Sequence, residues 1–136
     1  MQTKDISQEI ILPCFPQDAY DAWLDSDIHE KIIGAHAKID PKIGGKFDLW
    51  NGEMTGKTVT LDNKNLRIVQ EWRDNGSDWP KDYYSIITLT FLPSESKKTK
   101  LIFTQTGIPE EHAKDIENGW KDFYWKPMKE YFQSKK

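Results

Sequence analysis

The sequence contains one cysteine, Cys14, among its 136 residues. A single cysteine cannot form a disulfide within the chain, and it excludes a metal site built from four cysteines. No apolar run approaches the roughly 18 consecutive residues that a membrane-spanning helix needs, and the first residues lack the apolar core of a signal peptide. From these absences we expect a cytoplasmic protein with no membrane span.

The chain also lacks an excess of basic residues. Lysine and arginine together number 19 and aspartate and glutamate 22, which gives a formal net charge of −3 and an isoelectric point near 5.6. Proteins that bind nucleic acid usually carry a clustered basic surface, and no block of five like charges marks an interaction tail. The composition therefore predicts no nucleic-acid partner.

Motifs for catalysis, metals and cofactors are scarce as well. The three histidines show no metal-ligand spacing, and Cys14 is expected to be a half-buried structural thiol. The segment GEMTGKT at 52–58 resembles a phosphate-binding loop, but it has three residues between its glycines where four are required. An alternating segment follows it instead of a helix, so Gly56 indicates a bulge or a close backbone approach. We expect no catalytic residues, no metal and no cofactor.

Aromatic residues are abundant, and they concentrate near the end of the chain. In Glu110–Phe132, apolar side chains recur at helical spacings of three and four: Ala113, Ile116, Trp120, Phe123, Tyr124, Pro127 and Tyr131. This pattern predicts a long amphipathic helix. Gly119 and Pro127 are unfavourable inside a helix, so we expect a break near the first and a kink near the second.

The remainder of the chain predicts a sheet that would cover this helix. Asp5–Leu12 has the composition of a first strand, and two short helices follow, one from Pro16 to Leu24 and one ending at Gly34. From Ala35 onwards the apolar period is two, with turn signals such as Asn51-Gly52 between short strands. Strands without intervening helices predict an antiparallel sheet. The fold class is therefore α+β, in one domain covering residues 1–136.

The alternation also predicts which side chains face the helix. The expected inner face is Phe47, Leu49, Val59, Leu61, Ile68, Trp72, Ile87, Leu89, Phe91, Leu101 and Phe103. A curved sheet around one helix often leaves a ligand cavity, in which Ser85 and Gln105 could orient a ligand. The predicted pocket residues are Trp72, Ser85, Phe103, Gln105, Trp120, Phe123 and Tyr124. The alternative is that these aromatic side chains simply fill the core.

Six segments, in this order and spacing, carry a resemblance to a known family. They are GGKF at 44–47, LRIVQEWR at 66–73, Trp79-Pro80, ITLTF at 87–91, QTGIP at 105–109 and GWKDFYWKPMKEYF at 119–132. Together they resemble the C-terminal domain of the activator of the 90-kDa heat-shock chaperone's ATPase. The similarity extends from about Asp5 to Phe132.

The resemblance implies a START-like, birch-pollen-allergen-like helix-grip fold: a curved antiparallel sheet of about six or seven strands wrapped around a long C-terminal helix, with two short helices after the first strand. It also implies the 90-kDa heat-shock chaperone as a partner, although the family's full-length activator has a further N-terminal domain that makes a major contact. Three hypotheses follow. The first is a non-catalytic chaperone-associated protein, the second a carrier of a small hydrophobic ligand, and the third a cyclase- or hydrolase-like enzyme.

Overall fold

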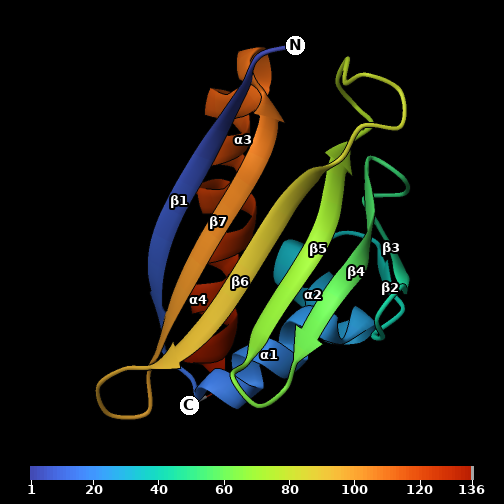
Figure 1. The fold of residues 1–136 in the computed structure, drawn as a ribbon. Helices are drawn as coiled ribbons and strands as arrows, with labels where there is room; N and C mark the ends of the chain where they lie inside the picture. The colour runs from blue at the N-terminus through green and yellow to red at the C-terminus, as the bar shows by residue number, and fades with distance from the viewer. Residues whose placement is uncertain (136) are drawn as a thin grey trace.

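The computed structural model describes residues 1–135 as a curved sheet packed on a long helix (Figure 1). Its elements are, in chain order, β1 (Thr3–Leu12), α1 (Pro16–Leu24), α2 (Ser26–Ile33), β2 (Ala37–Ile39), β3 (Lys46–Leu49), β4 (Met54–Asp62), β5 (Arg67–Asp74), β6 (Ser85–Pro93), β7 (Thr99–Pro109), the 3₁₀ turn η1 (Glu110–His112), α3 (Ala113–Trp120), the π turn η2 (Lys121–Trp125) and α4 (Lys126–Ser134). In this described part of the chain, no helix is long and apolar enough to cross a membrane.

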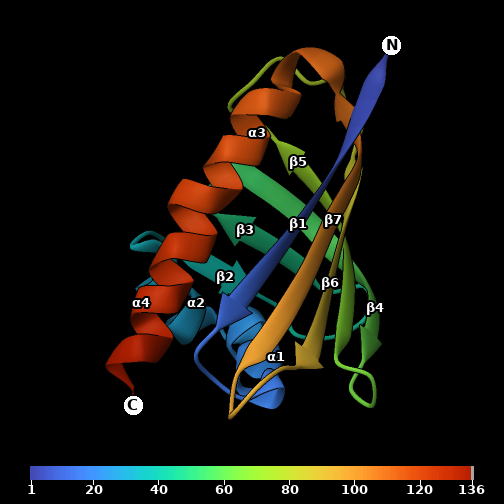
Figure 2. The ribbon, with the colours of Figure 1, turned by 90° about the vertical axis from the view of Figure 1, so that its left-hand side faces the viewer.

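The strands form one antiparallel sheet in the order β1-β7-β6-β5-β4-β3-β2. Consecutive strands from β2 to β7 are neighbours, while β1 pairs with β7 after the chain has passed through the two short helices. Figure 2 shows the sheet bending around the C-terminal helix, with α1 and α2 near the helix's lower end. The predicted helix-grip fold, with seven strands and two short helices after the first strand, is confirmed.

The C-terminal helix is continuous, but a π turn inserts one residue into the helical repeat that the sequence predicts. No break occurs at Gly119; η1, α3, η2 and α4 follow one another without interruption. The π turn at Lys121–Trp125 ends just before Pro127, which cannot donate the hydrogen bond an α-helix requires there. A π turn inserts one residue, so the apolar face continues through Trp125, Met128 and Phe132. The prediction that Phe123 faces the core is therefore wrong, because its side chain is 60% exposed.

A β-bulge in β4 makes a second prediction wrong. Thr58 pairs with Gln70 and Thr60 with Val69, so the register between the strands shifts at Val59. The extra residue turns Val59 outward, where it is 42% exposed, and Thr58 inward, where it is buried. A bulge of this kind reverses the alternation along a strand, which is why the expected inward position of Val59 is wrong.

Gly56 allows β3, β4 and β5 to pack closely. It stands opposite Phe47 on one neighbouring strand and Trp72 on the other. A Cβ atom at this position would overlap the backbone oxygen of Glu71 and lie 2.6 Å from Cζ of Phe47. The close backbone approach predicted for this glycine is confirmed, and the phosphate-loop-like segment lies on a turn and a strand.

His29 is the one buried histidine of the described chain, and its environment fixes its protonation state. Its Nδ1 lies 2.9 Å from the carbonyl oxygen of Trp23, which can only accept, so Nδ1 carries the proton. Its Nε2 lies 2.9 Å from the Tyr124 hydroxyl, which then donates to it. Burial lowers the pKa of His29 from 6.5 to about 4, because the charged form would lose its water. The histidine is therefore neutral in the folded protein at pH 7.

Gly56→Ala is expected to destabilise the protein by about 2–3 kcal/mol, because the methyl group overlaps backbone that cannot rotate away. Gly119→Ala is the matched control. Its Cβ would meet only Cδ2 of Phe123 at 3.8 Å, so we expect a gain of roughly 0.5–1 kcal/mol from helix propensity. Urea unfolding of both variants measures the difference. Equal effects at the two glycines would contradict the close approach at Gly56.

The stability of the folded state is expected to fall as the pH drops from 6.5 towards 4. In this window the unfolded chain protonates His29 and the folded chain does not, so the unfolded state binds more protons. The full pKa difference corresponds to roughly 3 kcal/mol. Urea unfolding of wild type and His29→Gln across pH 4–7 tests this. Parallel pH profiles would show that His29 is not responsible.

Candidate functional sites

A pocket of about 170 Å³ opens between the C-terminal helix and one end of the sheet. It lies under the β3–β4 turn and beside the loop that follows β5. Its lining residues are Trp50, Met54, Trp72, Asp74, Ser77, His112, Asp115, Ile116, Gly119, Trp120, Phe123 and Tyr124. We call it the aromatic pocket. An apolar cavity of about 150 Å³ is large enough for benzene, so this pocket suits a ligand of one ring or a short branched chain.

Aromatic rings form most of its wall. Trp50 meets Phe123 and Tyr124 edge to face, with ring centroids 6.2 and 5.9 Å apart and an interplanar angle of 77° in both pairs. Trp120 lies deeper, 4.8 Å from Tyr124 and 5.5 Å from Trp72 between centroids. Exposed Phe123 and half-buried Trp50 thus form the rim, and the three buried rings form the floor.

The turn that carries Trp50 has an unusual backbone. Trp50, Asn51 and Gly52 have φ angles of 51°, 55° and 93°, in the left-handed region that bulky residues rarely adopt. The predicted turn at Asn51-Gly52 is present, but the strands end at Leu49 and resume at Met54. A hydrogen bond from the Gly52 amide to Asp48 Oδ1, 2.6 Å long, holds this conformation. Strained backbone of this kind gathers at functional sites.

Acidic groups stand at the mouth of the pocket. Asp74 Oδ1 accepts from the Gly76 amide at 2.8 Å and Asp74 Oδ2 from the Ser77 hydroxyl at 2.9 Å. Asp115 projects from α3 and is exposed. His112 bonds Asp78 through Nε2, and Glu111 is near enough that the ligand-type atoms of the three residues lie within 4.8 Å of one another. Exposed carboxylates gather like this without a metal, so we treat the group as a source of negative charge.

The structure brings four of the seven predicted pocket residues together: Trp72, Trp120, Phe123 and Tyr124. The other three lie behind them. Phe103 packs under Trp120 with its centroid 4.5 Å away. Gln105 accepts from Trp120 Nε1 at 2.7 Å and donates to the Ser85 hydroxyl at 2.9 Å, which in turn donates to the Trp72 carbonyl oxygen at 2.7 Å. Ser85 and Gln105 are thus occupied in holding the core together.

The remaining lining residues were missed, although part of the set had a signal in the sequence. His112, Asp115 and Gly119 lie at spacings of three and four from one another and lead to the predicted Phe123, which places them along one side of a helix. The residues from the sheet side had no such signal, because only the fold brings Trp50, Met54, Asp74 and Ser77 to that helix.

Burial and hydrogen bonding affect three groups suited to nucleophilic or acid–base chemistry, Cys14, Tyr124 and His29. Burial raises the pKa of the Cys14 thiol to about 11, so little of the reactive thiolate is present near pH 7. Burial also raises the pKa of Tyr124, whose hydroxyl donates to His29. His29 itself lies inside the core with both ring nitrogens bonded.

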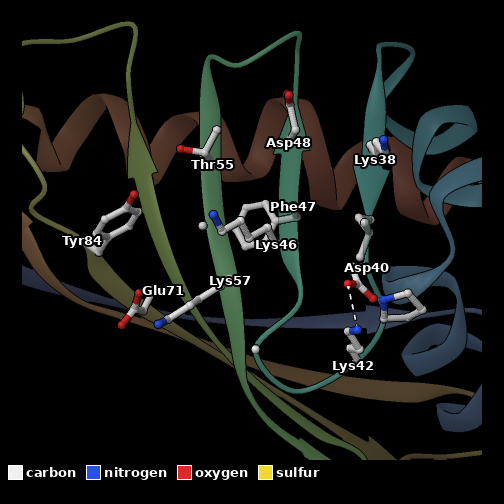
Figure 3. Close-up of a pocket in the computed structure, with 14 residues that line it drawn as sticks. Lys38, Asp40, Lys42, Lys46, Phe47, Asp48, Thr55, Lys57, Glu71 and Tyr84 are labelled. Carbon is white, nitrogen blue, oxygen red and sulfur yellow. Dashed lines mark ion pairs between the residues drawn. The ribbon is translucent and has the colours of Figure 1, made fainter.

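A second, larger concavity of about 1180 Å³ lies on the outside of the sheet, over β2, β3 and β4. Figure 3 shows the charged side chains Lys46, Lys57 and Glu71 among those that line it, on the outer side of the sheet. Lys46 stands directly opposite Lys57, and Lys57 directly opposite Glu71. Within the described residues neither lysine forms an ion pair, whereas Lys42 pairs with Asp40 at 3.7 Å. We call this surface the outer cleft.

The two opposed lysines lower the stability of the sheet. Like charges directly opposite on neighbouring strands destabilise a sheet by a few tenths of a kcal/mol up to about 1 kcal/mol. The outer cleft therefore places two lysines side by side, with Glu71 opposite Lys57 and Asp48 on the same strand as Lys46 (Figure 3). Such a pair is suited to contact with an acidic surface.

Comparison with known proteins places these features in a family. Residues 14–133 match the family described as activator of Hsp90 ATPase homolog 1-like protein. The chain is 33% identical over 120 residues to the activator of 90 kDa heat shock protein ATPase homolog of Dictyostelium discoideum, covering 88% of this chain and 30% of that protein. It is 27% identical to the human homolog 1 over 117 residues, covering 86% and 33%. The chain thus spans about a third of the length of these relatives.

Two solved structures have the same fold as this chain. An Hsp90 activator from Plasmodium falciparum superposes with a TM-score of 0.78 at 26% identity, covering 88% of this chain and 89% of that one. Ara h 8.0201 superposes with a TM-score of 0.77 at 13% identity, covering 98% and 99%, and shows the shared fold alone. With most of its length matched by the family, and with the sheet, helices and C-terminal helix in the expected order, this chain belongs to the activator of Hsp90 ATPase homolog 1-like family.

Proposed function

We propose that this protein is a non-catalytic associate of the 90-kDa heat-shock chaperone and contacts it through the outer cleft. The family supports the partner, since its relatives are named as activators of that chaperone's ATPase. The observation that carries the choice of surface is the pair Lys46 and Lys57, opposite each other on β3 and β4. Residues that lower stability without a partner in the fold are candidates for contact with a partner outside it.

The outer cleft is broad and carries charges of both signs. It extends across three strands and presents lysines beside Asp48 and Glu71, an arrangement that favours one binding register over others. Electrostatic contacts of this kind raise the association rate and make binding sensitive to salt. A transient, salt-dependent complex is therefore the expected mode of association.

The double variant Lys46→Gln/Lys57→Gln is expected to bind the chaperone about tenfold more weakly than wild type, a loss of about 1.4 kcal/mol. Its own stability should change little, because relief of the opposed lysines is offset by loss of the charge that stands opposite Glu71. NMR titration of labelled protein with the host's 90-kDa chaperone, and ATP turnover of the chaperone, give the two readouts.

Lys129→Gln is the matched control, since Lys129 is exposed on α4 beside β1 and away from the outer cleft. It should leave binding unchanged. Equal binding by the double variant and by wild type would exclude the outer cleft. If wild type neither binds the chaperone nor alters its ATP turnover, the association itself is wrong.

A second function is favoured by the aromatic pocket, namely binding of a small hydrophobic ligand between the sheet and the C-terminal helix. Its volume of about 170 Å³ and its wall of five aromatic rings support this candidate. An enzyme using the same pocket ranks third, because Cys14 and His29 lie outside its lining and are held in unreactive states.

Benzene at millimolar concentration is expected to shift the indole N–H resonances of Trp72 and Trp120 in labelled protein. Gly119→Leu should abolish these shifts, because the new side chain starts from an unobstructed Cβ position and extends into the pocket. Gly119→Ala, which adds one methyl group, serves as the control and should retain binding. Unchanged indole resonances in the wild type on adding benzene would remove this candidate.

A further inference from the structure

The charge around the aromatic pocket is of one sign. Asp74 and Asp115 are among its lining residues, and no lysine or arginine is among the described residues that line it. His112, the lining residue that can gain a positive charge, is bonded to Asp78 and adjoins Glu111. Even with His112 protonated, these four carboxylates leave the mouth of the pocket with a net negative charge.

The wall of the pocket adds to this preference. An aromatic ring carries partial negative charge on its faces, so an ammonium group within about 6 Å of a ring centroid is attracted to it. Trp50 stands at 77° to the rings of both Phe123 and Tyr124, so the rings approach the pocket from different directions. Aromatic rings set at steep angles around one space are the arrangement found in the cages that bind quaternary ammonium groups.

Among residues 1–135, neutral donors hold the carboxylate of Asp74 in place. Its two oxygens accept one hydrogen bond each, from the amide of Gly76 and the hydroxyl of Ser77. These donors are neutral, so the negative charge is fixed in position but not neutralised. Each carboxylate oxygen keeps acceptor capacity for a ligand. Asp115, on α3 across the mouth, provides a second charge.

We infer that the aromatic pocket binds a small organic cation, an ammonium group carrying alkyl substituents, with its substituents among the rings and its charge near Asp74 and Asp115. This inference names the ligand class of the second proposed function and rests on it. A ligand without charge would gain the apolar contacts alone. An anion would be repelled by the mouth of the pocket.

Three probes of nearly the same shape separate these alternatives: choline, its uncharged carbon isostere 3,3-dimethylbutan-1-ol, and the anion 3,3-dimethylbutanoate. Each is titrated into labelled protein at constant ionic strength, and the indole N–H resonances of Trp50, Trp72 and Trp120 are followed. We expect choline to bind at least tenfold more tightly than the alcohol, and the anion to produce no shifts. Equal affinity for choline and the alcohol overturns the inference while leaving a site for neutral ligands.

Single-residue variants show which charge and which ring contribute to choline binding. Asp115→Asn should weaken choline binding about three- to tenfold and leave the alcohol unaffected, since only the charge is removed. Asp122→Asn, on the same helix but outside the pocket, is the matched control and should change neither. Phe123→Leu keeps apolar volume but removes a ring face, so choline should lose affinity and the alcohol should not.

Benzene and choline together distinguish a pocket that does not prefer cations from a pocket that binds no ligand. If benzene shifts the indole resonances and choline does not, the pocket binds neutral apolar ligands and the cation inference is wrong. Should neither benzene nor choline bind, the ligand-binding function fails together with it. Equal loss of choline binding in Asp115→Asn and Asp122→Asn would assign the effect to general surface charge and would likewise overturn the inference.

Discussion

The contact of Trp120 with the concave face of the sheet is the constraint on which the rest of the structure depends. Its indole N–H donates to Gln105 at 2.7 Å, and its ring packs on Phe103 with centroids 4.5 Å apart. A buried indole must find an acceptor, and a buried amide must have its own groups satisfied. Gln105 does so through Ser85, whose hydroxyl bonds the backbone of β5. The helix is thereby held at one position and one rotation against three strands.

That position determines which side chains the helix exposes. With Trp120 fixed inward, an unbroken α-helix would bring Phe123 and Tyr124 close to the core and leave Trp125 on the flank. The π turn before Pro127 adds a residue, so Tyr124 and Trp125 are both buried and Phe123 turns outward. A large ring that is 60% exposed then stands opposite Trp50 at the end of the sheet. The aromatic pocket opens beside this pair, between the C-terminal helix and the end of the sheet.

Much of this fold could be predicted from the sequence, because the signals were periodic. The alternation after Ala35 and the helical spacing after Glu110 gave the sheet, the long helix and their order. The errors fell where one residue is inserted: the bulge at Val59 and the π turn at Lys121–Trp125. An insertion of one residue leaves the composition and the average period intact, so periodicity cannot reveal it. The carboxylates of the pocket were missed for another reason, since Asp74 and Asp115 meet only through the fold.

The two candidate sites use opposite sides of one hairpin. Lys46 and Lys57 project outward from β3 and β4, while Trp50 and Met54, at the turn ends of the same strands, line the aromatic pocket. Side chains of a strand alternate between its faces, so one hairpin can serve both sites without sharing a residue between them. A chaperone contact and a ligand site are thus compatible in this chain, and evidence for one does not weigh against the other. What separates them chemically is charge: the outer face offers two opposed lysines, and the pocket offers carboxylates and aromatic rings.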